Sequence, residues 1–271
     1  PAVRVIYYIS PKIWAWKTFR IKKIKRFIDR MYSILPFETD FYKKFNYTVE
    51  YVGNPSVDSV TAFKAQYTDN EFVAKYNLEE KPIIAVLAGS RRQEIAKCLS
   101  RMLDAAAYFS DFQIVVAGAP SVEKMFYEKI SLRKNFTLIF DATYELLVHS
   151  RAAIVNSGTA TLETALFNVP QVVVYHVPAG KFAIFLKNIF IKVKFISLVN
   201  LIADHKVVKE LIAQHFTPAN ICAEMPKLLF ETKERRQMLA DYAEIRQKLG
   251  AAGAAQNAAQ RIFAFLRFCE K

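Results

Sequence analysis

The sequence predicts an α/β protein with two Rossmann-like domains, the first of them incomplete, followed by C-terminal helices. Short apolar runs rich in β-branched residues alternate with helical segments, as in parallel sheets covered by helices. The breaker Gly53-Asn54-Pro55 divides this alternation into a short first part and a longer second part. We therefore predict the remainder of an N-terminal domain at 1–55, a helical linker at 56–78, a complete Rossmann-like domain at 79–230, and C-terminal helices at 231–271 that pack back on the first domain or on a partner subunit.

The first part begins with a strand-like run at residues 3–9, which ends at Ser10-Pro11. The loop that follows holds both tryptophans, Trp14 and Trp16. Two large aromatic side chains beside a strand end favour contact with something apolar, and simple packing is the alternative. Further strands at 32–35 and 49–52 flank a short helix that ends near residue 45. The first strands of a doubly wound sheet are missing, so we expect this chain to be the later part of a longer protein.

Residues 17–31 form a predicted helix with a divided surface. Ile21, Ile24, Ile28 and Met31 recur at three- and four-residue steps and make one apolar face. Against the single acid Asp29, the remaining surface carries seven cations: Lys17, Arg20, Lys22, Lys23, Lys25, Arg26 and Arg30. A basic amphipathic helix next to tryptophans indicates a membrane surface or a face for an anionic substrate, with an ordinary solvated face as the alternative.

Composition narrows the class of protein. The 38 Lys and Arg exceed the 25 Asp and Glu, and the net charge of +13 suits phosphates, anionic lipid or nucleic acid. Cys98, Cys222 and Cys269 are far apart and lack CxxC spacing, which indicates a reducing cytosol rather than a disulfide framework or a zinc site. The four histidines form no HExxH-like pair, so we predict no metal site.

The second part opens with a buried strand at 83–87 and a turn that contains Gly89, Ser90 and Arg91. Small residues between a strand and a helix let the backbone approach a phosphate, and Arg91 adds a forked cation. The predicted strands that follow are 113–117, 136–140, 152–155 and 172–175, and the predicted helices between them are 94–109, 143–149 and 160–167.

The segment 151–171 is the strongest candidate for a ligand site. Its strand feeds the turn Asn156-Ser157-Gly158-Thr159 and then a helix, so free backbone N–H groups and the positive end of a helix dipole converge at Gly158. We expect a diphosphate there. Glu163 lies one position beyond the place that a capping box requires, so it is free to accept hydrogen bonds from a ribose diol. A well-capped buried helix is the alternative.

Residues 179–196 combine apolar side chains, including Phe182 and Phe185, with four lysines. The pattern favours a helix at a membrane interface or along a groove for acyl chains, and a buried helix with snorkelling lysines is the equal alternative. Beyond it we expect a loop or short strand at 197–202 and helices at 206–215, 218–230, 232–249 and 254–267.

Several motifs occur in one order: SPKIWAWK from Ser10, LPFE from Leu35, LAGSR from Leu87, SGTATLE from Ser157, SLVN from Ser197, and Leu249-Gly250 with Gly253-Ala254. This series closely resembles the lipid-A-disaccharide synthases, which are glycosyltransferases of the GT-B fold with two Rossmann-like domains. The resemblance covers essentially the whole chain, and the SPxxWAW and SGTATLE pieces together are specific. Ala88 stands where the family usually has a proline, which affects the stiffness of that turn more than its chemistry.

The resemblance implies a reaction. UDP-2,3-diacylglucosamine would be joined to 2,3-diacylglucosamine 1-phosphate with inversion, giving lipid A disaccharide 1-phosphate and UDP, with no cofactor or metal. The enzyme would be cytoplasmic and peripheral on the inner face of the inner membrane of a Gram-negative bacterium. A homodimer is compatible with the sequence, and no nucleic-acid partner is expected.

By position, the resemblance assigns Gly89, Ser90 and Arg91 to the nucleotide phosphates, Ser157, Gly158, Thr159 and Thr161 to the diphosphate or sugar, Glu163 to the ribose, and Asn200 as a further nucleotide contact. The acceptor or membrane face comprises Trp14, Trp16, Lys17, Arg20, Lys22, Lys23, Lys25, Arg26, Phe182 and Phe185. Arg91 and helix N-termini would stabilise the charge on departing UDP. The family's glycine-rich first turn and proposed catalytic carboxylate would precede Pro1, so we name no general base and expect residues 1–271 alone to bind UDP without turnover.

Two other functions are compatible with parts of this pattern. A soluble UDP-N-acetylglucosamine epimerase or related GT-B enzyme would share the UDP site but not the basic and apolar surfaces. A basic nucleic-acid-binding protein would explain the charge, but no nucleic-acid-binding motif accompanies it.

Overall fold

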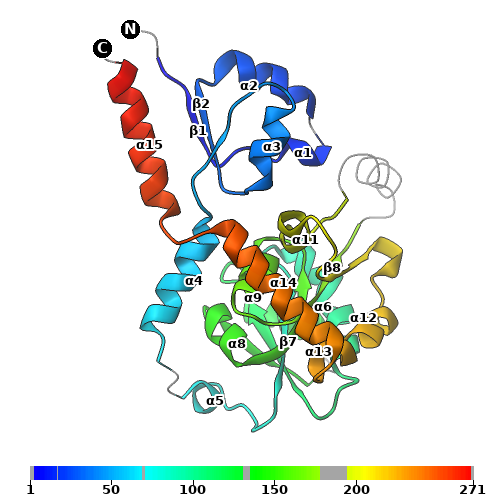
Figure 1. The fold of residues 1–271 in the computed structure, drawn as a ribbon. Helices are drawn as coiled ribbons and strands as arrows, with labels where there is room; N and C mark the ends of the chain where they lie inside the picture. The colour runs from blue at the N-terminus through cyan, green and yellow to red at the C-terminus, as the bar shows by residue number, and fades with distance from the viewer. Residues whose placement is uncertain (1–2, 17, 69–70, 131–134, 178–193, 270–271) are drawn as a thin grey trace.

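The computed structural model describes residues 3–16, 18–68, 71–130, 135–177 and 194–269. It contains two parallel sheets, one in a small N-terminal unit and one in a larger unit (Figure 1). The small sheet has the order β1-β2-β3, and the large one has the order β6-β5-β4-β7-β8-β9. The predicted α/β class with parallel sheets is confirmed.

The small unit consists of β1 (Ile6–Tyr8), α1 (Ile13–Trp16), η1 (Thr18–Arg20), α2 (Ile21–Phe27), β2 (Arg30–Ser33), α3 (Phe37–Lys43) and β3 (Glu50–Tyr51). The helix predicted to reach residue 31 ends at Phe27, and Met31 lies in β2. Asp29 explains the early end. Its carboxylate accepts a hydrogen bond from the Val5 N–H at 2.8 Å, and its own N–H donates to the Val5 carbonyl at 2.9 Å. Pairing with the preceding strand therefore overrides the helical periodicity.

The small unit leads into α4 (Pro55–Gln66) and α5 (Phe72–Lys75). Asn54 caps α4, because its side chain accepts a hydrogen bond from the Ser56 N–H at 2.9 Å. Its amide nitrogen also donates to the Ile34 carbonyl at 2.8 Å. The predicted breaker thus both starts the connecting helix and fixes it to the small unit.

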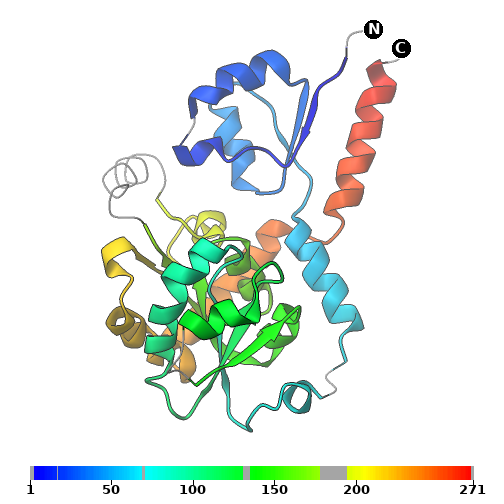
Figure 2. The same cartoon turned by 180° about the vertical axis from the view of Figure 1, so that it is seen from behind.

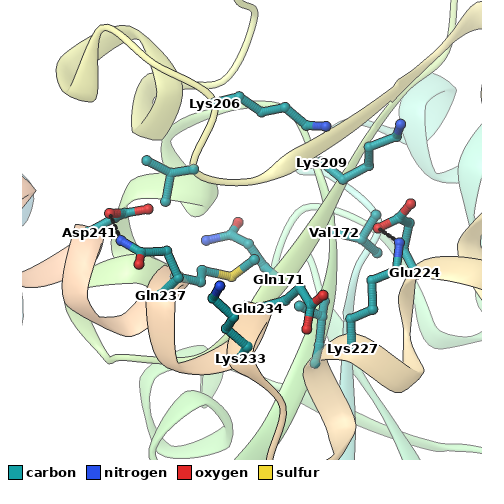
Figure 3. A pocket seen from close by; sticks show the side chains of 13 residues that line it. Gln171, Val172, Lys206, Lys209, Glu224, Lys227, Lys233, Glu234, Gln237 and Asp241 are labelled. Carbon is teal, nitrogen blue, oxygen red and sulfur yellow. Dashed lines mark hydrogen bonds and ion pairs between the residues drawn. The ribbon is translucent and has the colours of Figure 1, made fainter.

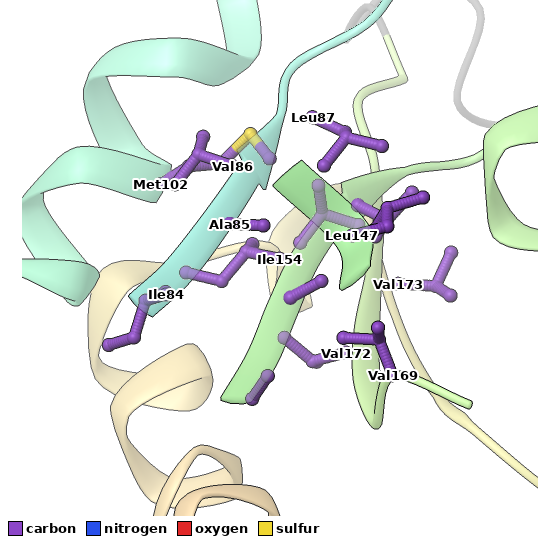
Figure 4. Packing of buried hydrophobic residues seen from close by; sticks show 14 of the residues in the cluster. Ile84, Ala85, Val86, Leu87, Met102, Leu147, Ile154, Val169, Val172 and Val173 are labelled. Carbon is purple, nitrogen blue, oxygen red and sulfur yellow. The ribbon is translucent and has the colours of Figure 1, made fainter. Parts of the chain in front are cut away.

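The large unit alternates strands and helices: β4 (Ile83–Leu87), α6 (Arg92–Ala106), β5 (Gln113–Gly118), α7 (Lys124–Ile130), β6 (Thr137–Phe140), α8 (Thr143–His149), β7 (Ser150–Asn156), α9 (Thr159–Leu166) and β8 (Gln171–Tyr175). Every residue of β4 is buried, as expected for a strand covered on both faces. Figure 4 shows Ile84, Val86 and Ile154 packed with Met102 of α6 and Leu147 of α8. This core holds the strand ends, and therefore the loops beyond them, in fixed positions.

Two predictions after β8 are wrong. Residues 197–202 are not a loop or strand but lead into α11 (Leu198–Ala203), which begins where the Ser197 hydroxyl accepts from the Asn200 N–H. The helix expected at 206–215 instead contains β9 (Lys209–Ile212) and η3 (Ala213–His215). β9 pairs in parallel with β8 and adds a sixth strand to the five we predicted. Most of the segment 179–196, with Phe182 and Phe185, lies outside the described residues.

Four helices end the chain: α12 (Pro218–Glu224), α13 (Pro226–Leu229), α14 (Lys233–Leu249) and α15 (Ala254–Cys269). α14 lies across the large unit, whereas α15 returns to the small unit (Figures 1 and 2). Ala258 of α15 packs in a buried cluster with Tyr32 and Val52, and Arg261 forms an ion pair with Glu50. The chain therefore passes between the two units twice. Within the described ranges, no helix combines the length and apolar character that a membrane span requires.

Candidate functional site

The two predicted phosphate-binding turns meet at the carboxyl edge of the large sheet. β4 and β7 are adjacent parallel strands, with Leu87 opposite Val155, and β7 is paired in turn with β8. The loops after Leu87 and Asn156 therefore leave the sheet side by side. Ligands of open α/β sheets bind at this edge, beyond the carboxyl ends of the strands.

The first turn depends on Gly89. Its φ of +120° is in the left-handed region, and a Cβ there would lie 2.6 Å from Glu94 Oε2 and 2.9 Å from Asn156 Nδ2. The Ser90 N–H donates to Glu94 Oε2 at 3.2 Å, and Arg91 donates to Glu94 Oε1 at 3.1 Å. The Arg91 side chain is 81% exposed. One carboxylate thus contacts the very donors that we assigned to a phosphate.

Glu94 was not among the predicted site residues. A signal for it exists in the sequence, because it stands in the first turn of α6, three residues after the N-cap residue Arg91. An acid at that position commonly reaches back to the N–H groups that precede a helix.

The second turn leaves the start of α9 uncapped. Ser157 is held by its own N–H, which donates to the Val174 carbonyl at 2.9 Å. Gly158, the N-cap residue, provides no side-chain cap, and the first turn of α9 contains no acid. Among the described residues, no atom would lie within 4 Å of a Cβ at Gly158, its two chain neighbours aside. Of the alternative, a well-capped buried helix, the burial holds for one face of α9, whereas the described residues provide no side-chain cap. The assignment of a diphosphate to the start of this helix stays a prediction.

The two threonines of the turn differ. Thr159 is exposed, whereas Thr161 is fully buried and its hydroxyl donates to the Gly158 carbonyl at 2.8 Å. That hydrogen bond fixes the backbone of the turn from behind. The assignment of Thr161 to a ligand stays a prediction, and its visible contact is with the protein.

Glu163 belongs to α9, and its side chain contacts Tyr144 of α8. Its Oε1 accepts a hydrogen bond from the Tyr144 hydroxyl at 3.0 Å, the single hydrogen bond that this carboxylate makes within the described residues. Burial raises the pKa of Glu163, and the hydrogen bond from Tyr144 lowers it in part. The ring of Tyr144 packs against Phe63 and Phe167, with centroids 5.4 and 5.0 Å away. Tyr144 holds one oxygen of Glu163 and was missed because the two are 19 residues apart.

Asn200 is buried and used by the local structure. Its Oδ1 accepts from the N–H groups of Val207 and Val208 at 2.8 and 2.9 Å, and its Nδ2 donates to Glu210 at 2.9 Å. These contacts shape the connection between α11 and β9. The assignment of Asn200 to the nucleotide stays a prediction.

Positive charge gathers beside the two turns. His176, directly after β8, has its pKa lowered by burial and then by the charges of Lys97 and Arg101 of α6. Those two side chains and Arg91 make this edge of the sheet attractive to anions. No three His, Cys, Asp or Glu side chains in the described part of the chain lie together as metal ligands would.

Glu38 connects two sequence motifs in the small unit. It is buried, and it accepts from the Trp14 indole N–H at 2.9 Å and from the Ser10 hydroxyl at 2.5 Å. Burial raises the pKa of Glu38, while these hydrogen bonds lower it in part. The carboxylate thus fixes the loop that carries Trp14, a role that the sequence did not reveal.

Trp14 faces a cleft between the two units. With Phe37, Phe41, Leu201 and Lys194 it lines a cavity of about 660 Å³ between α3 and α11. Lys17 and the side chain of Trp16 lie outside the described residues. The exposed cations Arg20, Lys22, Lys23, Lys25 and Arg26 belong to η1 and α2 instead. The predicted acceptor or membrane face stays a prediction, of which Trp14 lines this cleft and five cations are exposed on η1 and α2.

A further cavity of about 610 Å³ lies at the opposite, amino edge of the large sheet (Figure 3). It is lined by Gln171 and by four lysines: Lys206, Lys209, Lys227 and Lys233. Glu224 and Asp241 also line it, and Glu224 pairs with Lys227 at 3.0 Å. Gln171 and Lys209 begin β8 and β9, so this cavity is distant from the turns after β4 and β7.

Comparisons with known proteins agree with the motifs. The family model described as lipid-A-disaccharide synthetase matches residues 1–263. The lipid-A-disaccharide synthase of Myxococcus xanthus is 38% identical over 97% of this chain and 70% of its own length. Those of Koribacter versatilis and Coxiella burnetii are 34% and 36% identical over 96% of this chain, and the chain covers 68% and 69% of them.

Solved structures show the fold. UDP-GlcNAc 2-epimerase from Neisseria meningitidis, bound to UDP-GlcNAc, superposes with a TM-score of 0.66 at 12% identity, over 97% of this chain and 70% of its own. The calicheamicin glycosyltransferase CalG4 gives 0.52 at 15% identity, over 94% and 61%. At such identities the likeness confirms the GT-B fold and does not favour an epimerase. The sequence matches decide the family: this chain belongs to the lipid-A-disaccharide synthetases, glycosyltransferases of lipid A synthesis.

Proposed function

We propose that this chain binds the UDP-sugar donor of an inverting glycosyltransferase that joins UDP-2,3-diacylglucosamine to 2,3-diacylglucosamine 1-phosphate. The observation that carries the proposal is the uncapped start of α9, adjacent to the turn around Gly89. Free N–H groups and a helix dipole form an anion site, and a nucleotide diphosphate has the size and charge to use both turns.

The donors beside this site fit a diphosphate. Ser90 and Arg91 now contact the carboxylate of Glu94, and a phosphate carries the same kind of oxygen acceptors. In the proposed complex these donors pass from Glu94 to the phosphate. When the sugar is transferred, the charge left on UDP is stabilised by Arg91 and by the N-terminus of α9, without a metal.

Glu163 is proposed to bind the ribose. One of its oxygens is held by Tyr144, and the other is available to accept from ribose hydroxyls. Because a carboxylate accepts hydrogen bonds from hydroxyl donors most strongly when it is ionised, binding through Glu163 favours its charged form.

The acceptor is proposed to enter the cleft between α3 and α11. Its lining joins the rings of Trp14, Phe37, Phe41 and Phe195 to the amine of Lys44. Apolar surface beside a cation suits a lipid that carries a phosphate. Lipid substrates would place the enzyme at the cytoplasmic face of the inner membrane of a Gram-negative bacterium. The names of its relatives support the synthesis of lipid A disaccharide.

Calorimetric titration with UDP tests the donor site. Glu163→Ala should weaken UDP binding about tenfold or more, because a hydrogen bond to a charged group contributes roughly 1.5–3 kcal/mol. Thermal unfolding of both proteins serves as the control. A large loss of stability with unchanged UDP affinity would show that Glu163 is structural and would contradict the proposal.

A further inference from the structure

An exposed surface of the small unit has no role in the nucleotide site. We define it as the docking face: Phe19, Arg20, Lys23, Arg26 and Phe27. Phe19 is 72% exposed and Phe27 is 59% exposed. Four residues of the docking face line a groove of about 480 Å³: Phe19, Arg20, Lys23 and Phe27. The other lining residues of this groove are Tyr7, Pro11, Ile24 and Ile28.

The fold presents this face outward. Ile21 and Ile24 of α2 are buried in a cluster with Ile13, Met31 and Tyr42, so the helix is anchored by its inner face. Arg20, Lys23 and Phe27 follow one another at steps of three and four residues, which places them on one side of the helix. The structure therefore leaves two large aromatic side chains in solvent, Phe19 of η1 and Phe27 of α2.

The charge on this element has one sign. Residues 18–28 contain five cations and no acid, and none of the five makes an ion pair with any described residue. The guanidinium of Arg26 lies 5.3 Å from the centre of the Phe27 ring. Cations and exposed rings thus share one surface, and no acid of the described residues forms an ion pair with these cations.

We propose that the docking face binds the surface of an anionic bilayer. Phe19 and Phe27 enter the boundary between headgroups and acyl chains, while Arg20, Lys23 and Arg26 contact lipid phosphates. Each basic residue near an anionic leaflet contributes a similar increment of attraction, and buried aromatic surface adds to it. This deepens the proposed function by naming how its lipid-binding enzyme meets the membrane, but it uses no residue of the UDP site.

The rings distinguish a bilayer from a nucleic acid. Binding to a nucleic-acid duplex depends on cations that contact its phosphates, and these contacts do not depend on the base sequence. It gains nothing from two phenylalanines on the surface. A bilayer needs both components, so binding that requires the rings as well as the cations identifies lipid.

Flotation with vesicles tests the proposal. One set of vesicles contains phosphatidylglycerol and phosphatidylcholine, and the other contains phosphatidylcholine alone. The chain should bind the anionic vesicles and lose binding at high salt. Arg20→Gln, Lys23→Gln and Arg26→Gln together should weaken binding about tenfold or more, since each removes a cation from the leaflet surface. Phe19→Ser with Phe27→Ser should weaken it to a similar extent.

Matched controls are available elsewhere on the chain. Lys206→Gln, Lys209→Gln and Lys233→Gln remove the same total charge from the cavity at the amino edge of the large sheet. Tyr108→Ser and Phe263→Ser remove two rings that are 82% and 66% exposed. Both controls should bind vesicles within about twofold of the unchanged protein, since neither alters the docking face. Thermal unfolding and UDP titration should be unchanged in all four variants.

Two results would overturn the proposal. The first is vesicle binding that falls equally in the docking-face variants and in their controls, which would indicate a diffuse effect of net charge. The second is tight binding to duplex DNA that the cation variant loses and the ring variant keeps, which would indicate a nucleic-acid surface. Because UDP titration is measured separately, failure of the membrane proposal and failure of the nucleotide proposal give different results.

Discussion

Tyr144 determines how Glu163 can act. A carboxylate with one oxygen held at 3.0 Å by a packed tyrosine has a fixed orientation, so its second oxygen points in a fixed direction. The Tyr144 ring is itself fixed by Phe63 of α4 and by Phe167 after α9. A ribose would therefore meet a preorganised acceptor rather than a mobile side chain.

Tyr144→Phe should preserve the ring contacts and remove the hydrogen bond. UDP affinity should fall roughly fivefold, in line with about 1 kcal/mol for one hydrogen bond. The pKa of Glu163 should rise further, because the hydrogen bond from Tyr144 lowers it in the unchanged protein. As pH falls, the variant should therefore lose its ionised carboxylate, and with it UDP affinity, at a higher pH than the unchanged protein does. The preference for UDP over 2′-deoxy-UDP should shrink. Calorimetry with both nucleotides across a pH series measures this, and an unchanged preference would contradict a positioning role.

Glu38→Gln tests the second buried carboxylate. Burial raises the pKa of Glu38 from 4.5, so the folded state favours the protonated carboxyl. The stabilisation of the fold that results is fully present below pH 4.5 and is lost as pH rises through the raised pKa. Across this window, the free energy of unfolding of the unchanged protein should fall relative to that of Glu38→Gln, by about 1.4 kcal/mol per unit of pKa shift. Urea unfolding at several pH values measures the difference. Glu80 is exposed, so Glu80→Gln is the control. If the free energies of unfolding of Glu38→Gln and of the unchanged protein depend on pH in the same way, the pKa of Glu38 is not raised.

Some residues of the site could be predicted from the sequence, and others could not. Gly89, Ser90 and Gly158 stand in local strand-turn-helix patterns, and the structure brings their two turns together. Tyr144 and Glu38 were missed because their partners are distant in the sequence. Glu94 contacts the nearby Ser90 and Arg91, so its local signal was present and was overlooked. Ser10 and Glu38 are 28 residues apart, and nothing local joins them.

The turns after β4 and β7 use glycine for different reasons. Gly89 is required by the protein, both for its positive φ and for the approach of Glu94 and Asn156. Gly158 has an extended backbone that any residue adopts, and no atom of the part of the chain that the structure describes lies within 4 Å of its Cβ position. The need for glycine at 158 therefore comes from a ligand, if the proposed diphosphate binds there.

Gly89→Ala and Gly158→Ala form a matched pair. Gly89→Ala should lower the free energy of unfolding by about 1–3 kcal/mol, the cost of a strained backbone. Gly158→Ala should leave stability within about 0.5 kcal/mol, as at a surface site, yet weaken UDP about tenfold by obstructing the phosphate. Urea unfolding and calorimetry separate the two effects. Unchanged UDP affinity in Gly158→Ala would contradict a diphosphate at α9.

Local sequence patterns predicted the bounds of a helix or strand correctly where the pattern of buried residues is regular. The strand at 83–87 and the helix at 143–149 have the predicted bounds, because a continuous apolar run and a clear periodicity leave little choice. β9 was predicted as helix because its run Lys-Glu-Leu-Ile has a weak pattern, and its strand state comes from pairing with β8. Such pairing is a non-local contact that propensity does not contain.

The whole molecule depends on α15 to complete the small unit. Ala258 is buried in one cluster with Tyr32 and Val52, and the hydroxyl of Tyr51 donates to the Leu249 carbonyl at 2.7 Å. The last helix of the chain thus covers a sheet formed by its first residues.

Ala258→Glu should detach α15 from that sheet, because it buries a charge without a partner. Hydrogen exchange should accelerate in α15, β2 and β3 and stay unchanged in β4–β8. The loss of stability should be about 1–3 kcal/mol in the small unit. Ala259→Glu places the same charge on the exposed side of the helix and is the control. Equal protection in both variants would mean that α15 contributes little to the small unit.

The two passages of the chain between the units lie against each other. Gly53 has a φ of +104°, a Cβ there would lie 3.1 Å from the Ala254 Cα, and the Gly253 N–H donates to Asp58 at 2.7 Å. Two covalent connections fixed side by side restrict the relative movement of the units. A rotation about them would widen or narrow the space between Trp14 and α11, whereas a sliding movement would break the contact of Gly53 with Ala254 and the hydrogen bond from Gly253 to Asp58.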